Sequence, residues 1–266
     1  MKPESPRLET LRFTWDDTGI ATLTLNAPEK HNALSPAMIA ELSAMAARIN
    51  ADPAIRVAIL AGEGASFCAG GDLGWMRQQM TATRGQRMAE ARKLAEMLYA
   101  LNTLEKPLIG RVHGNAFGGG VGMIAVCDVA IAAEGAKLGL TETKLGLIPA
   151  TISPYVLARM GEGRARRVFM SARLFEAREA AELGLLAKVV PAEDLDAAVM
   201  AEAKPYLATA PGAVAASKAL ARAMGPRIDA QVINDTIRRL ADTWENPEAM
   251  EGVSAFFEKR KAHWVR

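Results

Sequence analysis

A glycine-rich turn within residues 113–128, H-G-N-A-F-G-G-G-V-G-M-I-A-V-C-D, contains the first residues that could do chemistry. The apolar run at 108–112 before it predicts a buried strand, and the run at 121–127 predicts an interior helix. This order places backbone N–H groups at the positive end of a helix, where the first amides have no internal partner. The turn could therefore bind an anion or an oxyanion, or its glycines could serve only close packing.

Spacing excludes two kinds of nucleotide-binding loop at this turn. A dinucleotide fingerprint needs G-x-G-x-x-G, and starting from Gly118 its third glycine position falls on Met123. A P-loop closes on G-K-S or G-K-T, and no such triplet stands here. The turn therefore suits a group smaller than a pyrophosphate.

A second glycine loop lies at residues 61–73, A-G-E-G-A-S-F-C-A-G-G-D-L. It follows an apolar run at 57–60 that predicts a buried strand. Gly70 and Gly71 expose backbone, and Asp72 is placed where it could cap the segment that follows.

A third loop, residues 138–149, has the sequence L-G-L-T-E-T-K-L-G-L-I-P, in which Glu142 is the only acidic residue. Apolar neighbours raise the pKa of a carboxyl group, which would make Glu142 a candidate acid or base. The alternatives are a glutamate on the surface and one paired with Lys144.

The elements that position these loops alternate between strands and helices through the first two thirds of the chain. We expect strands at 11–15, 20–25, 57–60, 108–112 and 129–132, and helices at 36–50 and 84–102. Ser35 would cap the first helix and Pro36 would begin it. The alternation implies an α/β layer fold.

From about residue 153 helices follow one another, and only residues 185–190 look extended. Prolines at positions 205, 211, 226 and 247 mark the boundaries of four predicted helices near the end of the chain. This last part is either a helical lid on the same core or an appendage that forms oligomers.

Composition excludes several classes of protein. The 266 residues are 50% hydrophobic with a net charge of +2, which predicts a sizeable core and argues against a dedicated nucleic-acid surface. The two cysteines, Cys68 and Cys127, are too few for a disulfide framework and do not have the spacing of zinc ligands. We therefore expect the protein to reside in a reducing compartment and to bind no metal. The first residues lack a signal-peptide core, and the best apolar run, 121–133, is interrupted by Asp128. We expect a cytoplasmic protein that does not enter the membrane.

Three motifs taken together resemble the crotonase superfamily, the enoyl-CoA hydratases and isomerases. They are H-G-N-A-F-G-G-G, F-C-A-G-G-D-L and G-L-T-E-T-K-L-G-L-I-P, in this family's order and with compatible spacing. The resemblance extends from about residue 20 to the C-terminal G-V-S-A-F-F-E-K-R-K-A. It implies a crotonase-type spiral of ββα units over residues 1–200 and a C-terminal helical trimerisation region over residues 201–266.

The resemblance also implies the chemistry. Members of this family bind an acyl-CoA thioester and stabilise the enolate formed when a proton is added or removed beside the carbonyl. Two backbone N–H groups hold the thioester oxygen, and by their place in the motifs these are those of Gly71 and Gly119. Glu142 matches the glutamate of the later loop. Coenzyme A is part of the substrate, so no separate cofactor is expected.

One position departs from the family pattern. Hydratases of this family usually carry a second glutamate two residues after the glycine triplet, and this chain has Gly122 there. A single carboxylate must then serve both proton transfers, or the reaction is a double-bond isomerisation that needs one base. A non-catalytic acyl-CoA-binding member of the family is the third alternative.

The neighbouring residues T-E-T-K-L-G-L-I-P-A-T-I-S-P-Y-V and G-D-L-G-W-M look similar to bacterial methylglutaconyl-CoA hydratases of leucine breakdown. In that subgroup the first glutamate is likewise often absent. A fixed glutamate would repel the carboxylate of such an acyl chain by roughly 4 kcal/mol when the two charges are about 4 Å apart and the effective dielectric constant is about 20. Our hypothesis is that Gly122 removes this charge and opens space. Tyr155, Ser153 and Trp75 are further pocket candidates.

The residues that bind the CoA part of the substrate are assigned from the same resemblance. The segment at 26–34, N-A-P-E-K-H-N-A-L, matches the family stretch that clasps the adenine and the pantetheine. The resulting CoA- or substrate-binding candidates are Lys30, His31, Ala33, Ala69, Gly70, Asp72, Gly118 and Gly122. Phe256 and Lys259 match positions that reach the CoA of a neighbouring subunit in relatives. That match implies a homotrimer, commonly paired into a hexamer.

Overall fold

The main sheet of the computed structural model, which describes residues 8–266, has six strands in the order β1-β2-β3-β5-β7-β10. β1 and β2 form an antiparallel hairpin, and the remaining neighbours pair in parallel. The strands are Leu11–Trp15, Ile20–Leu25, Val57–Gly62, Leu108–Val112, Val129–Ala133 and Lys188–Val190. The predicted hairpin is therefore confirmed, and β3 and β7 run slightly beyond their predicted ends.

A second sheet has four short strands in the order β4-β6-β8-β9. The ββα units implied by the family resemblance need a second strand each, but no local sequence pattern marked these strands. The strands of the second sheet are Ser66–Cys68, Asn115–Phe117, Lys137–Gly139 and Leu174–Glu176. β4, β6 and β8 begin a few residues after β3, β5 and β7, so each turn of the chain adds one strand to each sheet. A helix or helical turn follows every such pair, which confirms the spiral of ββα units.

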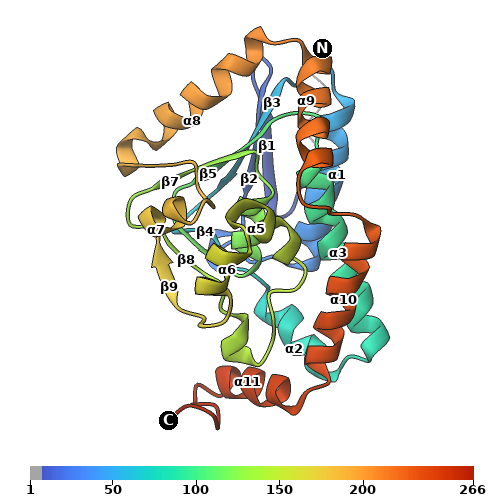
Figure 1. Cartoon of the computed structure of the whole chain (residues 1–266). Helices are drawn as coiled ribbons and strands as arrows, with labels where there is room; N and C mark the ends of the chain where they lie inside the picture. The colour runs from blue at the N-terminus through green and yellow to red at the C-terminus, as the bar shows by residue number, and fades with distance from the viewer. Residues whose placement is uncertain (1–7) are drawn as a thin grey trace.

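Helices of the spiral cover both sheets (Figure 1). The Oγ of Ser35 accepts a hydrogen bond from the backbone of Met38, which confirms the predicted helix start. Thr83 and Gln86 form a capping box at the start of α3, whose bounds are those predicted. The helices are α1 Pro36–Ala51, α2 Leu73–Thr81, α3 Arg84–Asn102, α4 Gly119–Ala125, α5 Ser153–Met160, α6 Glu162–Phe169 and α7 Ala177–Glu182.

Alternating residues of the main sheet face two separate cores. Leu23 and Leu60 belong to the larger core, which includes the interior helix α4. Ile59 and Ile109 on the other face pack against Leu195 and other residues of α8. This alternation is the period of a strand covered on both faces.

Four helices follow the spiral: α8 Leu195–Ala203, α9 Pro211–Met224, α10 Ala230–Trp244 and α11 Pro247–Phe257. Prolines begin α9 and α11, as predicted, whereas Pro205 lies in the 3₁₀ turn Lys204–Ala208. α10 packs alongside α3, and α11 packs against the turn that holds Glu142 (Figure 1). The predicted division between residues 200 and 201 falls within α8.

Over residues 8–266, each helix is too short or too polar to cross a bilayer.

Candidate active site

Three parallel strands of the small sheet end at the same edge and lead to the three motifs. β4 leads to residues 69–72, β6 to α4, and β8 to the 3₁₀ turn Glu142–Leu145. Parallel strands present their carboxyl ends together, and ligands bind at such edges. Gly71, Gly119 and Glu142 accordingly line one cavity of about 110 Å³. Its other walls are largely apolar and include Leu34, Trp75, Ile148, Ile152, Leu240 and Trp244.

The loop at 69–72 is held by the segment that precedes α1. Ala69 N–H donates to the carbonyl of His31 at 2.9 Å, and Leu34 N–H donates to the carbonyl of Gly70 at 2.7 Å. Asp72 caps α2 as predicted, because its carboxylate accepts from the Trp75 N–H at 2.9 Å. The Gly71 N–H takes part in none of these hydrogen bonds.

The second amide is at the start of α4. Gly118 has a φ of +48°, and its N–H donates to the carbonyl of Gly139 at 2.8 Å. Gly119 is the first residue of the helix, where an N–H has no intrahelical acceptor. In the part of the chain that the structure describes, neither the Gly71 N–H nor the Gly119 N–H has a hydrogen-bond acceptor. Both are free to bind a ligand oxygen.

Close packing accounts for some of the glycines but not for Gly71. A Cβ at Gly120 would lie 2.3 Å from the Cys68 carbonyl oxygen, and one at Gly70 would lie 2.7 Å from that of Phe117. A Cβ at Gly71 would meet nothing closer than Trp75, at 3.8 Å. The packing alternative therefore explains how the two loops approach each other, and it leaves Gly71 to another role.

Among the described residues that line the cavity, Glu142 is the only ionisable one. The residue as a whole is half-buried, but its Oε2 is inaccessible to solvent and has no hydrogen-bond partner within residues 8–266. Burial raises the pKa of Glu142 to about 7 from an ordinary 4.5, and the residue's own backbone N–H lowers that pKa by less. The exposed Lys144 forms no ion pair with it, so both alternatives for Glu142 are wrong.

Gly122 does not line the cavity, and the hypothesis that it opens space is wrong. A Cβ at this position would lie 2.3 Å from Cγ2 of Ile152. The side chain of Ile152, thirty residues later in the chain, fills the volume next to Gly122. Ile152 lies within a segment that the sequence analysis quoted, but it was not named there as a candidate.

The predicted CoA segment lies beside the loop at 69–72. Lys30 and His31 are exposed, Ala33 is buried, and His31 has a φ of +51°. Asn32, which the sequence analysis missed, is buried and fixes this bend. Its side chain accepts from the Ala27 N–H at 2.9 Å and donates to the carbonyls of Glu63 and Ser66, both at 2.8 Å.

The other predicted binding residues are placed by their backbone. Ala69 and Gly70 hold the loop through the hydrogen bonds to His31 and Leu34, and Gly118 lies against Glu142. A Cβ at Gly118 would come within 2.9 Å of Glu142 Oε1. Phe256 in the last turn of α11 and Lys259 just after this helix are exposed and do not line the cavity.

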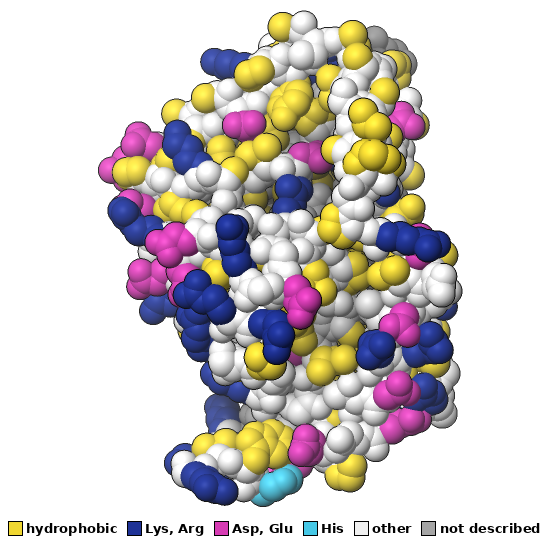
Figure 2. Space-filling view, viewed as in Figure 1, with side chains coloured by type: hydrophobic (Ala, Val, Ile, Leu, Met, Phe, Trp, Pro, Cys, Tyr) yellow, Lys and Arg dark blue, Asp and Glu magenta, His cyan; other side chains and the backbone are white. Residues whose placement is uncertain are grey.

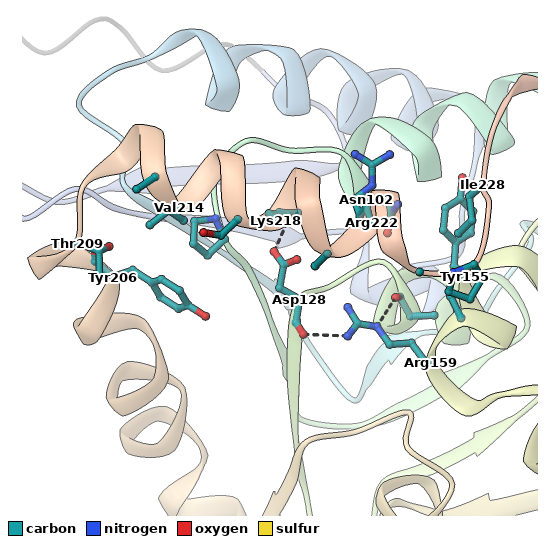
Figure 3. A pocket seen from close by; sticks show the side chains of 18 residues that line it. Asn102, Asp128, Tyr155, Arg159, Tyr206, Thr209, Val214, Lys218, Arg222 and Ile228 are labelled. Carbon is teal, nitrogen blue, oxygen red and sulfur yellow. Dashed lines mark hydrogen bonds and ion pairs between the residues drawn. The ribbon is translucent and has the colours of Figure 1, made fainter.

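A larger cavity of about 800 Å³ lies between α9 and the core, away from these groups (Figure 3). Lys218 on α9 forms an ion pair with Asp128 at 2.7 Å, and the same carboxylate oxygen accepts from the Leu108 N–H. Tyr155 lines this cavity with a buried hydroxyl that has no partner among the described residues, and burial raises its pKa. The hydroxyl of Ser153 donates to the carbonyl of Ala150. Of the three further pocket candidates, only Trp75 lines the smaller cavity.

The model of the enoyl-CoA hydratase/isomerase family matches residues 16–266. The chain belongs to this family. As a member of the enoyl-CoA hydratase/isomerase family it is an enzyme, with the mixed α/β architecture of the family's solved structures. Over residues 8–266 no group of three or more His, Cys, Asp or Glu side chains is arranged to hold a metal ion.

Relatives of this family member match it over almost their whole length. A crotonyl-CoA hydratase of Syntrophomonas wolfei is 33% identical, over 92% of this chain and 94% of the relative. A mevalonyl-coenzyme A hydratase of Aspergillus fumigatus is 32% identical, over 97% and 96%. The crystal structure of an enoyl-CoA hydratase from Shewanella pealeana superposes with a TM-score of 0.80 at 37% identity, covering 97% of each chain.

Proposed function

We propose that this enzyme adds water across the 2,3 double bond of an enoyl-CoA, and removes it in reverse, with Glu142 as the only catalytic carboxylate. One observation carries the proposal. Among the described residues, two backbone amides without acceptors and one buried carboxylate oxygen without a hydrogen-bond partner line the same apolar cavity. The family and the hydratase names of its relatives support this chemistry.

The proposed reaction starts from ionised Glu142. The thioester oxygen accepts hydrogen bonds from the amides of Gly71 and Gly119, and Glu142 takes a proton from water as the water oxygen bonds to C3. The electron pair of the double bond moves toward the thioester oxygen, giving an enolate. Glu142 then returns the proton to C2, so that one molecule of water is added. Losing one such amide donor costs about 3–4 kcal/mol of transition-state stabilisation.

The single carboxylate also favours a second candidate reaction, double-bond isomerisation. An isomerase needs only one base, which removes a proton from one carbon and delivers it to another. Product analysis separates the two reactions. Hydration gives a 3-hydroxyacyl-CoA and a mass gain of one water, whereas isomerisation moves the double bond at constant mass. Absence of any turnover that depends on Glu142 would leave the third alternative, an acyl-CoA-binding protein.

The proposal also covers which acyl group the enzyme accepts. The sequence resemblance suggests methylglutaconyl-CoA, whose acyl chain ends in a carboxylate. Within the described residues, the cavity lining offers no Lys or Arg to pair with that charge, and a carboxylate buried without a partner is strongly disfavoured. We therefore propose that the buried part of the acyl group is short and uncharged, and that a distal carboxylate would have to remain in solvent.

A matched substrate pair tests this point. 3-Methylglutaconyl-CoA and 3-methylcrotonyl-CoA share the branched enoyl group and differ by the distal carboxylate. We expect a higher kcat/KM for the uncharged substrate. A preference for the carboxylated one would show that a cationic group reaches the acyl chain, and would overturn the uncharged assignment without affecting the hydratase proposal.

We further propose that the enzyme assembles as a homotrimer or hexamer in which Phe256 and Lys259 reach a neighbour's CoA. The helix α9 has no buried residue, and its Leu220 and Met224 are 63% and 78% exposed. This exposed apolar surface supports a contact between α9 and a neighbouring subunit. The reaction needs only acyl-CoA and water, so no separate cofactor is proposed. Both cysteines are free and buried, which supports a reducing, cytoplasmic location.

A further inference from the structure

Ile152 occupies a position that no catalytic role explains. It precedes α5, is 2% exposed and lines the same cavity as Gly71, Gly119 and Glu142. Its side chain lies against Gly122 on α4, where a Cβ would be 2.3 Å from its Cγ2 and 2.9 Å from its Cβ. The same Cβ would lie 3.8 Å from Cδ2 of Leu98 on α3.

We propose that Ile152 is the specificity-determining residue of this cavity. It limits the length and branching of the acyl group and keeps any side chain, charged or neutral, from position 122. The proposal rests on the proposed function in that the cavity is taken to hold the acyl group.

The rigidity of Ile152 makes it suitable for this role. A β-branched side chain has few χ1 rotamers, and this one lies at the start of α5 against Gly122 of α4, in a region where the two helices pack together. The cavity of about 110 Å³ is small beside the roughly 300–1,000 Å³ of common ligand pockets. A fixed wall in a small apolar cavity discriminates by size, and one methylene in such a pocket changes kcat/KM by about 10- to 200-fold.

The contact with Gly122 also explains why the site has one acid. A glutamate at position 122 would need the volume that the Ile152 side chain fills, so the two side chains exclude each other. With Ile152 in place, the wall beside Gly122 is apolar, and within residues 8–266 Glu142 is left as the only carboxylate that lines the cavity.

The first test compares Ile152→Ala with the conservative control Ile152→Val. The kcat/KM values for straight-chain 2-enoyl-CoAs of four, six and eight carbons are measured for each protein. We expect Ile152→Ala to raise the eight-to-four-carbon ratio at least tenfold, and Ile152→Val to raise it far less. An unchanged ratio in a folded Ile152→Ala protein would overturn the proposal.

Binding provides a readout that does not need turnover. Dissociation constants of the saturated acyl-CoAs of the same lengths, measured by calorimetry, should shift in the same direction in Ile152→Ala. If the wild-type enzyme turns over no enoyl-CoA, the proposed function fails, and the binding series still decides the role of Ile152. An unchanged preference for chain length in binding overturns it.

The second test is a double-mutant cycle on the contact itself. Gly122→Ala should lower the melting temperature because its Cβ meets Ile152. Ile152→Gly removes the obstructing atoms, so Gly122→Ala should cost much less stability in the Ile152→Gly background. Additive losses would show that the two positions do not exclude each other. Gly163→Ala, where a Cβ meets nothing within 4 Å, controls for the added methyl group.

Discussion

At the scale of single residues, burial without a partner decides the behaviour of Glu142. No cation pairs with its carboxylate among the described residues, so desolvation is the dominant influence and raises its pKa to about 7. A general base works best when its pKa lies near the working pH. The apolar lining that we propose for the acyl group would therefore also prepare Glu142 for proton transfer.

Replacement of Glu142 by Gln should separate catalysis from binding. We expect turnover to fall by about 10²- to 10⁴-fold, because a positioned acid or base contributes that much. The dissociation constant of a saturated acyl-CoA should change little, since the amide keeps the shape of the side chain. Glu162→Gln is the matched control, because its side chain is 78% exposed. Full activity of Glu142→Gln would refute the assigned role.

The raised pKa of Glu142 also predicts a pH-dependent stability. An acid whose folded pKa is about 7 and whose unfolded pKa is about 4.5 favours unfolding when ionised, so the penalty is absent below pH 4.5 and complete above pH 7. The full penalty is about 3 kcal/mol by linkage. The stability of Glu142→Gln relative to wild type should therefore increase between pH 5 and pH 8.

Chemical denaturation across this pH range measures the difference. The loss or gain of hydrogen bonds to the amide is the same at every pH, so only the slope with pH reports on Glu142. A difference that stays constant from pH 5 to pH 8 would mean that the carboxyl group titrates normally.

At the scale of elements, the site depends on two short strands lying close enough for their following loops to touch. β4 and β6 pair in parallel, and the carbonyl of Cys68 at the end of β4 approaches Gly120 at the start of α4. Only a residue without a side chain permits this approach. The same contact brings the loop of Gly71 to the helix start at Gly119.

Substitution of Gly120 by Ala should therefore be strongly destabilising. The added Cβ would lie 2.3 Å from a backbone oxygen, which cannot turn aside as a flexible side chain can. We expect a loss of several kcal/mol in the free energy of unfolding, at the upper end of about 1–3 kcal/mol for overpacking or beyond it. Gly85→Ala near the start of α3, where a Cβ meets nothing within 4 Å, should be neutral or slightly stabilising. Equal melting temperatures for the two variants would contradict the packing argument.

At the scale of the whole molecule, α9 differs from the other α-helices of residues 8–266, because it has no buried residue. The Lys218–Asp128 ion pair ties it to the core, and the cavity of about 800 Å³ lies beneath it. On the face seen in Figure 2, basic and acidic side chains are interspersed, with hydrophobic side chains among them. The exposed Leu220 and Met224 on α9 are consistent with a contact to a second copy of the chain.

Light scattering coupled to size-exclusion chromatography should give the mass of three or six chains. Leu220→Glu combined with Met224→Glu should shift the enzyme toward smaller species, because it places charges on a surface that we expect to be buried in the assembly. Lys93→Glu on the exposed surface of α3 serves as a charge control. A wild-type monomer with full activity would refute the proposed assembly.

Elements with enough residues to show a period were predictable from the sequence. The hairpin of β1 and β2 and the helix α3 have the predicted bounds, because alternation over 5 or 6 residues and helical spacing over 19 residues are strong signals. Glu142 stood out as a lone acid in an apolar run, and the glycine motifs marked the two loops. The family resemblance added their roles.

The tertiary structure alone decided three things: the bounds and order of the strands in the second sheet, the environment of Glu142 and the neighbour of Gly122. Strands of three residues are too short to show a period, so β4, β6 and β8 left no signal of their own. Whether Glu142 lies in solvent or in a cavity depends on α10 and other distant elements that contribute to its walls. Gly122 meets Ile152 only because α4 packs against α5, and a contact between residues thirty positions apart is a property of packing that local sequence does not encode.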